Sequence, residues 1–333
     1  MKFFHQILLI HCSGRVGDSL LATPAFFNVQ KIFPNAKIDL FAHRNRLDLF
    51  KNTPNIELLG SISEKRAWYK GWASRKKYDY VIVFNYDNPL KNIIKFALRV
   101  GKHVIASDLD DDKMNSKLYV SIPRLPNQHH IDIYNSYLSS FKLKKKFTRI
   151  KFYLTTNEIN FAKSLLNQHK LLKSKFLVGY QIVSFPTRSY RDWPVDNFLT
   201  LAYKILQIKP NAFFIIFGSI EDRSKLTHFI KHMPEDSYLD LTGLSLRKTA
   251  AVMSLIDLYI GVDTGPSHMM SAFDVPMLTM YHGKFPSKYY APIGHPYSIA
   301  MDHPKKDKCS ENDSMADISV DNVFSKLKKF LRK

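Results

Sequence analysis

The chain has 333 residues, of which 45% are hydrophobic, and this composition supports folded cores and excludes a largely disordered protein. Lysine and arginine outnumber acidic residues by 49 to 29, a formal net charge of +20 that indicates a polyanionic partner: nucleic acid, an anionic membrane surface or a phosphorylated substrate. The two cysteines, Cys12 and Cys309, form no CxxC or Cys/His cluster, which argues against a disulfide scaffold or structural zinc site and suits a reducing compartment.

The first apolar run, Ile7–Cys12, predicts a β-strand. We prefer a strand to a signal peptide because His5 and Gln6 interrupt the apolar stretch and no small-residue cleavage site follows. A helical pattern runs from residue 18 to about residue 33. No run approaches the roughly 20 apolar residues of a membrane-spanning helix, so we expect a soluble or peripheral protein. The next strand candidates are 37–43, 56–60 and 80–85.

Residues 141–154, FKLKKKFTRIKFYL, are basic without a clear period and predict a connection, after which a helical stretch at 157–170 restarts the alternation of strand and helix. Such alternation predicts parallel βα units and an α/β protein of two Rossmann-like doubly wound domains. We place these domains at 1–155 and 156–318, followed by a C-terminal amphipathic helix at 319–333. The later strand candidates are 176–183, 212–218, 238–243, 257–263 and 276–281, and the later helix candidates are 195–206 and 246–256.

The stretch YIGVDTGPSHMMSAFDVP ends a predicted strand in polar residues. The strand ends at Asp263, and the turn Thr264–Gly265 leads into a helix that begins with Pro266. Amides at this helix start, a close backbone approach at Gly265 and the hydroxyls of Thr264 and Ser267 predict a diphosphate cradle. In the alternative interpretation, Thr264 is only the N-cap of a helix.

Two other strand ends carry groups suited to a nucleotide. In SFPTRSYRDWP, Thr187 offers a hydroxyl, and Arg188 and Arg191 offer fixed positive charge that can grip phosphate oxygens. In FGSIED, Glu221 could hydrogen-bond a ribose. The alternatives are a solvated basic loop and an early-helix acid that complements the helix dipole.

After the first predicted strand comes CSGRVGDSLLATPA. Its glycines, Gly14 and Gly17, lack the GxGxxG spacing of a dinucleotide fingerprint, so we discount NAD. Asp18 lies at or near the helix start. It could be an N-cap, or it could be a general base for an acceptor hydroxyl.

The segments GRVGDSLLATPA, TRSYRDWP and GVDTGPSHMMSAFDVP, in this order, resemble the ADP-heptose–lipopolysaccharide heptosyltransferases, glycosyltransferase family nine. The resemblance implies a GT-B fold, with an acceptor-binding first domain and a nucleotide-sugar-binding second domain facing a central cleft. It also implies an inverting transfer of heptose from ADP-heptose to the inner core of lipopolysaccharide or lipooligosaccharide, with no cofactor and no required metal. The alternatives are a related transferase that uses another nucleotide sugar, or a nucleotide-sugar epimerase of similar fold.

The same resemblance assigns roles by motif position. Asp18 matches the proposed catalytic base, and Thr187 and Arg191 match donor-binding positions. The family often has lysine where this chain has Arg191, and this departure leaves the donor sugar open. Glu221 loosely matches an acidic position associated with the nucleoside. The segment that holds the donor sugar and diphosphate is matched by Asp263, Thr264, Gly265 and His268.

The segment EKRAWYKGWASRKK, residues 64–77, interleaves aromatic with basic residues. We expect it to contact the acceptor or an anionic membrane surface, although it could also bind single-stranded nucleic acid or be a plain surface helix. No recognised nucleic-acid motif appears, so we expect no nucleic-acid partner. The expected location is cytoplasmic, peripheral on the inner membrane of a Gram-negative bacterium. The contact candidates are Arg66, Trp68, Lys70 and Trp72.

Two further acidic or histidine-containing stretches could suggest a metal site. SDLDDD, residues 107–112, contains a D-x-D but lacks the glycine and distal glutamate of an EF-hand loop. We interpret it as a solvated acidic loop. The adjacent His129 and His130 are interpreted as polar residues on a helix face. We therefore expect no metal site.

Overall fold

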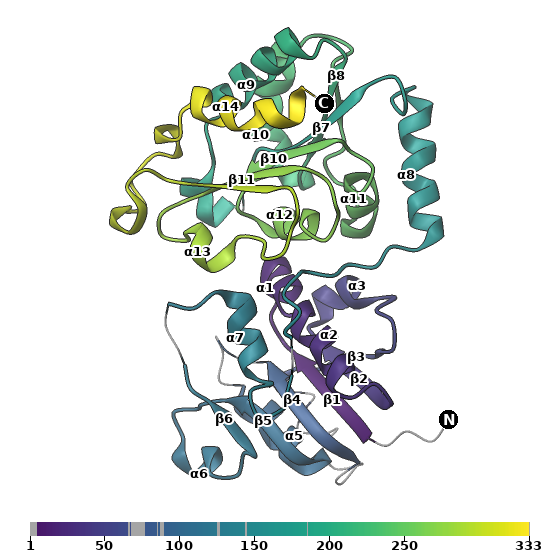
Figure 1. The fold of residues 1–333 in the computed structure, drawn as a ribbon, viewed down its shortest axis with the longest axis vertical. Coiled ribbons are helices and arrows are strands. Elements are labelled where there is room, and N and C mark those ends of the chain that lie inside the picture. Colours follow the sequence, from purple (N-terminus) through teal and green to yellow (C-terminus); the bar gives the residue numbers. More distant parts are fainter. Residues whose placement is uncertain are drawn as a thin grey trace. The chain divides into compact units, whose positions relative to one another are not determined.

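In a computed structural model, the chain forms two compact units, Met1–Tyr153 and Leu154–Lys333 (Figure 1). Each unit is a six-stranded parallel sheet with helices packed on it. This confirms the predicted α/β class with two doubly wound domains. The residues that the structure describes are 5–65, 67, 77–84, 86, 90–124, 127–143, 145–184 and 186–332.

The sheet of the first unit has the strand order β3-β2-β1-β4-β5-β6, and all its neighbours are parallel. The order reverses direction between β1 and β4, the kind of switch point beyond which ligands bind in open parallel sheets. The strands are β1 (His5–His11), β2 (Ala36–Ala42), β3 (Glu57–Ser61), β4 (Tyr78–Phe84), β5 (Gly101–Ser107) and β6 (Val120–Ile122).

The helical pattern expected from residue 18 to residue 33 is two helices, so the single-helix prediction is wrong. Helix α1 covers Val16–Leu21 and α2 covers Thr23–Ile32. Pro24 lies in the first turn of α2 and cannot donate a backbone hydrogen bond, which interrupts the helical ladder. The other helices of this unit are α3 (Leu47–Phe50), α5 (Lys91–Val100), α6 (Asp112–Asn115) and α7 (His130–Ser136).

The basic connection, residues 141–154, is hydrogen-bonded to the first unit. Among its described residues, 141–154 contain no helix or strand. The buried side chain of Asn28 donates to the carbonyl of Phe147 at 2.9 Å and accepts from its amide at 2.8 Å. The amide of Lys151 donates to the Thr23 hydroxyl at 3.0 Å. Thr155 then begins α8 (Thr156–Gln168) with a capping box.

The second unit repeats the topology of the first. Its strand order is β12-β11-β10-β7-β8-β9, so the direction reverses between β7 and β10. Nearly all side chains of the central strands are buried, because helices cover both faces of the sheet. The strands are β7 (Phe176–Gln181), β8 (Ala212–Phe217), β9 (Tyr238–Asp240), β10 (Leu258–Val262), β11 (Met277–Tyr281) and β12 (Ser298–Asp302).

Figure 1 shows α9 (Val195–Ile208) and α14 (Val320–Leu331) on one side of this sheet and α11 (Leu246–Met253) and α12 (Gly265–Met270) on the other. The apolar face of α14 joins the same core as α9, and the buried indole of Trp193 donates to the carbonyl of Ile318 at 2.8 Å. In the described part of the chain, no helix has the length and apolar character needed to cross a membrane. The remaining helices are α10 (Arg223–His232) and α13 (Ser287–Tyr290).

Candidate active site

Asp18 follows β1 after a short loop. The N-cap of α1 is Arg15, and Asp18 lies in the first turn, so the interpretation of Asp18 as the N-cap does not describe this helix. One carboxylate oxygen accepts from the Ser13 hydroxyl at 3.0 Å and lies 3.8 Å from the Arg15 guanidinium. The side chain is 15% exposed. Asp18 is therefore a fixed carboxylate at the carboxyl edge of the sheet, still reachable by a ligand.

Side chains that follow β2 contact this loop. The Arg46 Nε–H donates to the carbonyl of Gly14 at 2.6 Å. A Cβ added to Gly14 would lie only 3.4 Å from the His43 ring. Burial lowers the pKa of His43, and the neighbouring Arg46 and Arg44 lower it further. Sequence reasoning missed these three residues, although the string HRNR directly follows a correctly predicted strand.

His11 ends β1 and has no exposed surface. Its ring packs edge-on against Phe26, Phe50 and Tyr134, with centroids 5.7–6.2 Å away. Neither ring nitrogen has a hydrogen-bond partner among the described residues. Burial lowers the pKa of His11 to about 4, against an opposing effect of Asp18. The imidazole is therefore neutral at neutral pH, at the end of the strand that leads to α1 and Asp18.

In the second unit, the loops at the switch point meet through Arg191 and Asp263. The Arg191 guanidinium donates to the Asp263 backbone carbonyl at 2.7 Å and also to its carboxylate. Both residues are buried, at 8% and 3% exposure. The His268 Nε2 atom lies 3.3 Å from the other carboxylate oxygen. The structure thus brings together three predicted donor-binding residues from the ends of β7 and β10.

Phe285, in the loop after β11, completes this group. Its ring centroid lies 4.7 Å from the Arg191 guanidinium carbon and 5.3 Å from that of Arg188. Burial, and after it the neighbouring Arg188, lowers the pKa of Arg191 to about 10, so Arg191 remains protonated at neutral pH. The Nε–H of Arg191 has no partner among the described residues. Two cations thus share one aromatic ring, and within the described part of the chain only Arg191 is paired with a carboxylate, an arrangement that favours an anionic ligand.

At the start of α12, the polar side chains form hydrogen bonds within the protein. Thr264 is the N-cap residue, yet its hydroxyl makes no capping bond and instead donates to the carbonyl of Val262 at 3.3 Å. The Ser267 hydroxyl is buried, donates to the same carbonyl at 2.6 Å and contacts the Tyr259 hydroxyl at 2.9 Å. Gly265 is the first residue of the helix. Ser267 therefore supports the loop, and Thr264 and Gly265 lie next to Asp263.

The two remaining predicted donor residues are exposed. Thr187 lies in the turn Pro186–Arg191, which leads to the buried guanidinium. Glu221 lies after β8, and hydrogen bonds from its own backbone amide and then from the Ser219 side chain lower the pKa of its carboxyl group. The buried acid of this turn is Asp222, whose carboxylate accepts from the Ser219 amide at 2.8 Å. Sequence reasoning singled out the exposed acid and missed the buried one beside it.

The acceptor or membrane candidates Arg66, Trp68, Lys70 and Trp72 lie outside the described residues. Within the described ranges, no three histidine, cysteine or acidic side chains gather as a metal site would require. In the predicted acidic loop, Asp111 caps α6 by accepting from the Met114 amide at 3.1 Å. His129 likewise caps α7.

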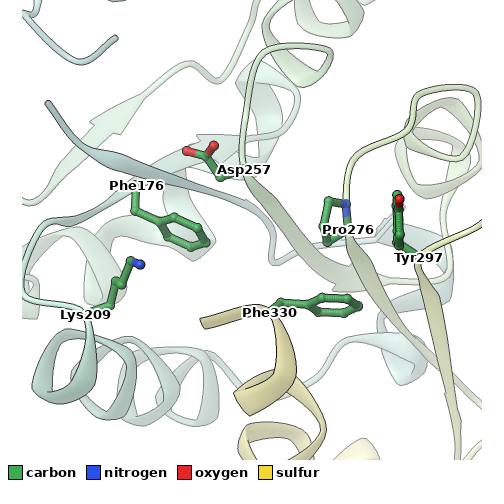
Figure 2. Close-up of a pocket in the computed structure, with 6 residues that line it drawn as sticks. All are labelled: Phe176, Lys209, Asp257, Pro276, Tyr297 and Phe330. Carbon is green, nitrogen blue, oxygen red and sulfur yellow. The ribbon is translucent and has the colours of Figure 1, made fainter. Parts of the chain in front are cut away.

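A cavity of about 420 Å³ opens at the opposite edge of the second sheet (Figure 2). Four of its lining residues begin or directly precede β7, β10, β11 and β12, at the amino ends of these strands, and the other two, Lys209 and Phe330, come from the end of α9 and from α14. Arg191 and Asp263 lie beyond the carboxyl ends. The cavity is therefore separate from the candidate site. It is lined by Phe176, Lys209, Asp257, Pro276, Tyr297 and Phe330.

Glycosyltransferases of family 9 and heptosyltransferases are found among the family models, curated proteins and solved structures that are similar to this chain. The model of glycosyltransferase family 9 (heptosyltransferase) matches residues 116–318. Lipopolysaccharide heptosyltransferase 3 of Escherichia coli is 24% identical over 296 residues, covering 80% of each chain. A family 9 glycosyltransferase structure from Veillonella parvula has a TM-score of 0.80 at 19% identity and covers 99% of this chain and 98% of its own. The E. coli heptosyltransferase WaaC, solved with ADP, has a TM-score of 0.70 at 17% identity, covering 98% and 99%.

Proposed function

Because the chain belongs to glycosyltransferase family 9, the heptosyltransferase family, we propose that it is an inverting transferase that moves heptose from ADP-heptose to the inner core of a lipopolysaccharide or lipooligosaccharide. The observation that carries the proposal is the group of Arg188, Arg191 and Asp263 at the switch point of the second unit. An open parallel sheet binds its ligand at this place. The relative WaaC has been solved with ADP.

The second unit is proposed to bind the donor. The Arg191 Nε–H is a buried donor without a partner among the described residues, and such a group costs about 1–3 kcal/mol unless a ligand satisfies it. A phosphate oxygen would satisfy it and would also neutralise the excess positive charge of two guanidiniums against one carboxylate. Asp263 and His268 then lie beside the diphosphate, where they can contact the hydroxyls of the transferred sugar.

The first unit is proposed to supply the base. The Asp18 carboxylate takes the proton of the acceptor hydroxyl as the hydroxyl oxygen bonds to the anomeric carbon of the heptose. The bond from that carbon to the diphosphate breaks on the opposite face of the sugar, which inverts the configuration. The electron pair leaves with ADP, and the arginines stabilise its charge. Ser13 and Arg15 hold the carboxylate in place for this proton transfer.

The surroundings of Asp18 suit an anionic acceptor. Arg15, Arg44 and Arg46 lie on or beside the same loop, and Arg44 and Arg46 lower the pKa of His43. Phosphate or carboxylate groups on a glycolipid core would pair with these cations. We propose that the enzyme meets this acceptor at an anionic membrane surface, in agreement with its net charge of +20.

The proposal is tested by incubating the purified protein with a panel of nucleotide sugars and core acceptors and measuring product mass. We expect one added heptose from ADP-heptose. Asp18→Asn should lower kcat by roughly 10²–10⁴ and leave ADP affinity unchanged. Asp112→Asn, an acid in the first turn of α6, is the matched control and should keep wild-type turnover.

Three outcomes would contradict the proposal. Conversion of the sugar nucleotide without any acceptor would indicate an epimerase. Transfer of another sugar only would exclude ADP-heptose as the donor. Wild-type turnover in Asp18→Asn would remove the assignment of the base.

A further inference from the structure

The ring of Phe285 contacts both guanidiniums of the donor site, although no sequence motif drew attention to it. The loop that carries the ring is anchored on both sides. At Gly283 an added Cβ would lie 2.1 Å from the carbonyl oxygen of Lys306, so the backbone passes too closely for any side chain. At Ser287, both the amide and the hydroxyl donate to the Asp302 carboxylate, at 2.7 and 2.6 Å. The ring therefore belongs to a fixed loop.

The contacts restrain Arg191 in two different ways. Hydrogen bonds to the carbonyl and carboxylate of Asp263 hold one edge of the guanidinium. The aromatic ring of Phe285 lies 4.7 Å from its central carbon. A flat guanidinium can stack on an aromatic ring while its edge makes hydrogen bonds, whereas a lysine ammonium has no such plane. Arginine can therefore make both kinds of contact at position 191 with one flat group.

We propose that Phe285 is a positioning residue of the donor site, which holds Arg191, and beside it Arg188, in the orientation that meets the diphosphate of the nucleotide. The ring thereby makes lysine a poor substitute for Arg191. This inference rests on the proposed function in one respect, because the ligand is taken to be a nucleoside diphosphate. Phe285 itself exchanges no proton and acts only through the arginines.

A double-mutant cycle tests the proposal. The variants are Phe285→Leu, Arg191→Lys and the double substitution, and calorimetry gives the ADP dissociation constant of each. Loss of a desolvated cation–π contact corresponds to a roughly 5- to 30-fold weaker affinity. We expect each single change to weaken ADP binding by this factor. The double variant should be at most about threefold weaker than Arg191→Lys alone, because both changes remove the same contact.

Rescue and control variants separate positioning from packing. Phe285→Tyr keeps the aromatic face and should bind ADP within about threefold of the wild type. Phe324→Leu removes a ring of α14 that contacts Lys204 of α9 and Lys328 of α14, and it should leave ADP binding unchanged. Urea unfolding of every variant checks that each one is folded. Inorganic pyrophosphate, measured in the same cycle, should show the same coupling, because the arginines face the diphosphate.

The inference would be overturned if the two single changes weakened ADP binding independently, so that their factors multiplied in the double variant. It would also be overturned if Phe285→Leu and Phe285→Tyr lost equal ADP affinity, and either result would leave the proposed function intact. A wild-type protein that binds neither ADP nor pyrophosphate would also overturn it. A protein that shows the coupling but transfers no heptose would support the role of Phe285 and contradict the proposed function.

Discussion

At the scale of single residues, His11 shows how burial sets a charge state. The imidazole ends the first strand among three aromatic rings, and its nitrogens find no partner among the described residues. Charging it would place an unpaired cation in an apolar environment, which is why its pKa falls to about 4. The first unit therefore contains a group that opposes folding once the surroundings become acidic.

We predict that His11→Leu reduces the acid sensitivity of the protein. In the unfolded chain a histidine titrates near pH 6.5, so between pH 6.5 and 4 the unfolded state binds more protons than the folded state. The stability that depends on a neutral His11 is therefore fully present above pH 6.5. The free energy of unfolding falls by on the order of 2–3 kcal/mol as the pH approaches 4. Urea unfolding at pH 7.5 and 4.5 should show a smaller loss of stability in the variant.

The matched control is Phe26→Leu, which alters packing against the same imidazole without removing a titrating group. It should lower stability by a similar amount at both pH values. An identical pH dependence in wild type and His11→Leu would show that His11 does not remain neutral in the folded state.

At the scale of elements, burial explains which strands the sequence predicts. ILLIHC and AFFIIFG are continuous apolar runs because helices cover both faces of β1 and β8. Strand β5 was missed because its first half contains Lys102 and His103. Edge strand β12 was missed because its residues are only partly buried or exposed, and β6 because it has only three residues.

The candidate site was predictable only in part. Strand ends pointed to Arg191 and Asp263 separately, because polar residues after buried strands are visible in the sequence. Their hydrogen bond joins residues 72 positions apart and depends on how β7 and β10 pair. Nothing in the sequence marked Phe285 as part of the site, because an isolated aromatic residue in a loop resembles any other. Contacts between loops follow from the sheet topology and from close backbone packing, as at Gly283.

A partly buried ion pair joins α8 to α11. The Arg247 guanidinium donates to both oxygens of Glu158, which also forms the capping box of α8. The Arg247 hydrogen bond is the main cause that lowers the pKa of Glu158 to about 2. We predict that Glu158→Gln lowers the free energy of unfolding by about 1.5–3 kcal/mol at pH 7, measured by urea denaturation.

The pH dependence of this pair provides a second measurement. The folded pKa of Glu158 lies below its unfolded value, so its contribution is present above pH 4.5 and is lost as the pH falls towards 2. The free energies of unfolding of Glu158→Gln and the wild type should therefore differ least at acidic pH. Glu311→Gln, which breaks an exposed pair with Lys284, is the control and should cost at most about 1 kcal/mol. An equal effect of the two changes would contradict the structural role of Glu158.

At the scale of the whole molecule, the net charge of +20 is compatible with the proposed contact with an anionic membrane surface, and residues 64–77 test it. Each basic side chain near such a surface contributes about 1 kcal/mol, and salt screens the attraction beyond a Debye length of about 8–10 Å. We predict that six substitutions to glutamine in residues 64–77 release the protein from anionic vesicles in a sedimentation assay and raise only the acceptor KM. The changed residues are Lys65, Arg66, Lys70, Arg75, Lys76 and Lys77.

A second variant with the same loss of charge distinguishes a local contact from a general attraction. It replaces six lysines of the second unit and should remain bound to the vesicles. Equal release of both variants would show that only net charge matters. Continued sedimentation of the first variant at moderate salt would exclude the segment 64–77 as the contact. The control lysines are Lys163, Lys170, Lys173, Lys175, Lys326 and Lys329.

The hydrogen bonds of the basic connection to α2 have a consequence for synthesis on the ribosome. Each unit is one continuous stretch of chain, so the first unit can fold while the second is still being made. The buried amide of Asn28 nevertheless gains its two backbone partners only when Phe147 has emerged, and Thr23 waits in the same way for Lys151. The nascent first unit therefore stays incomplete until almost its last residue has emerged, and these hydrogen bonds form just before Thr155 and the next helix follow.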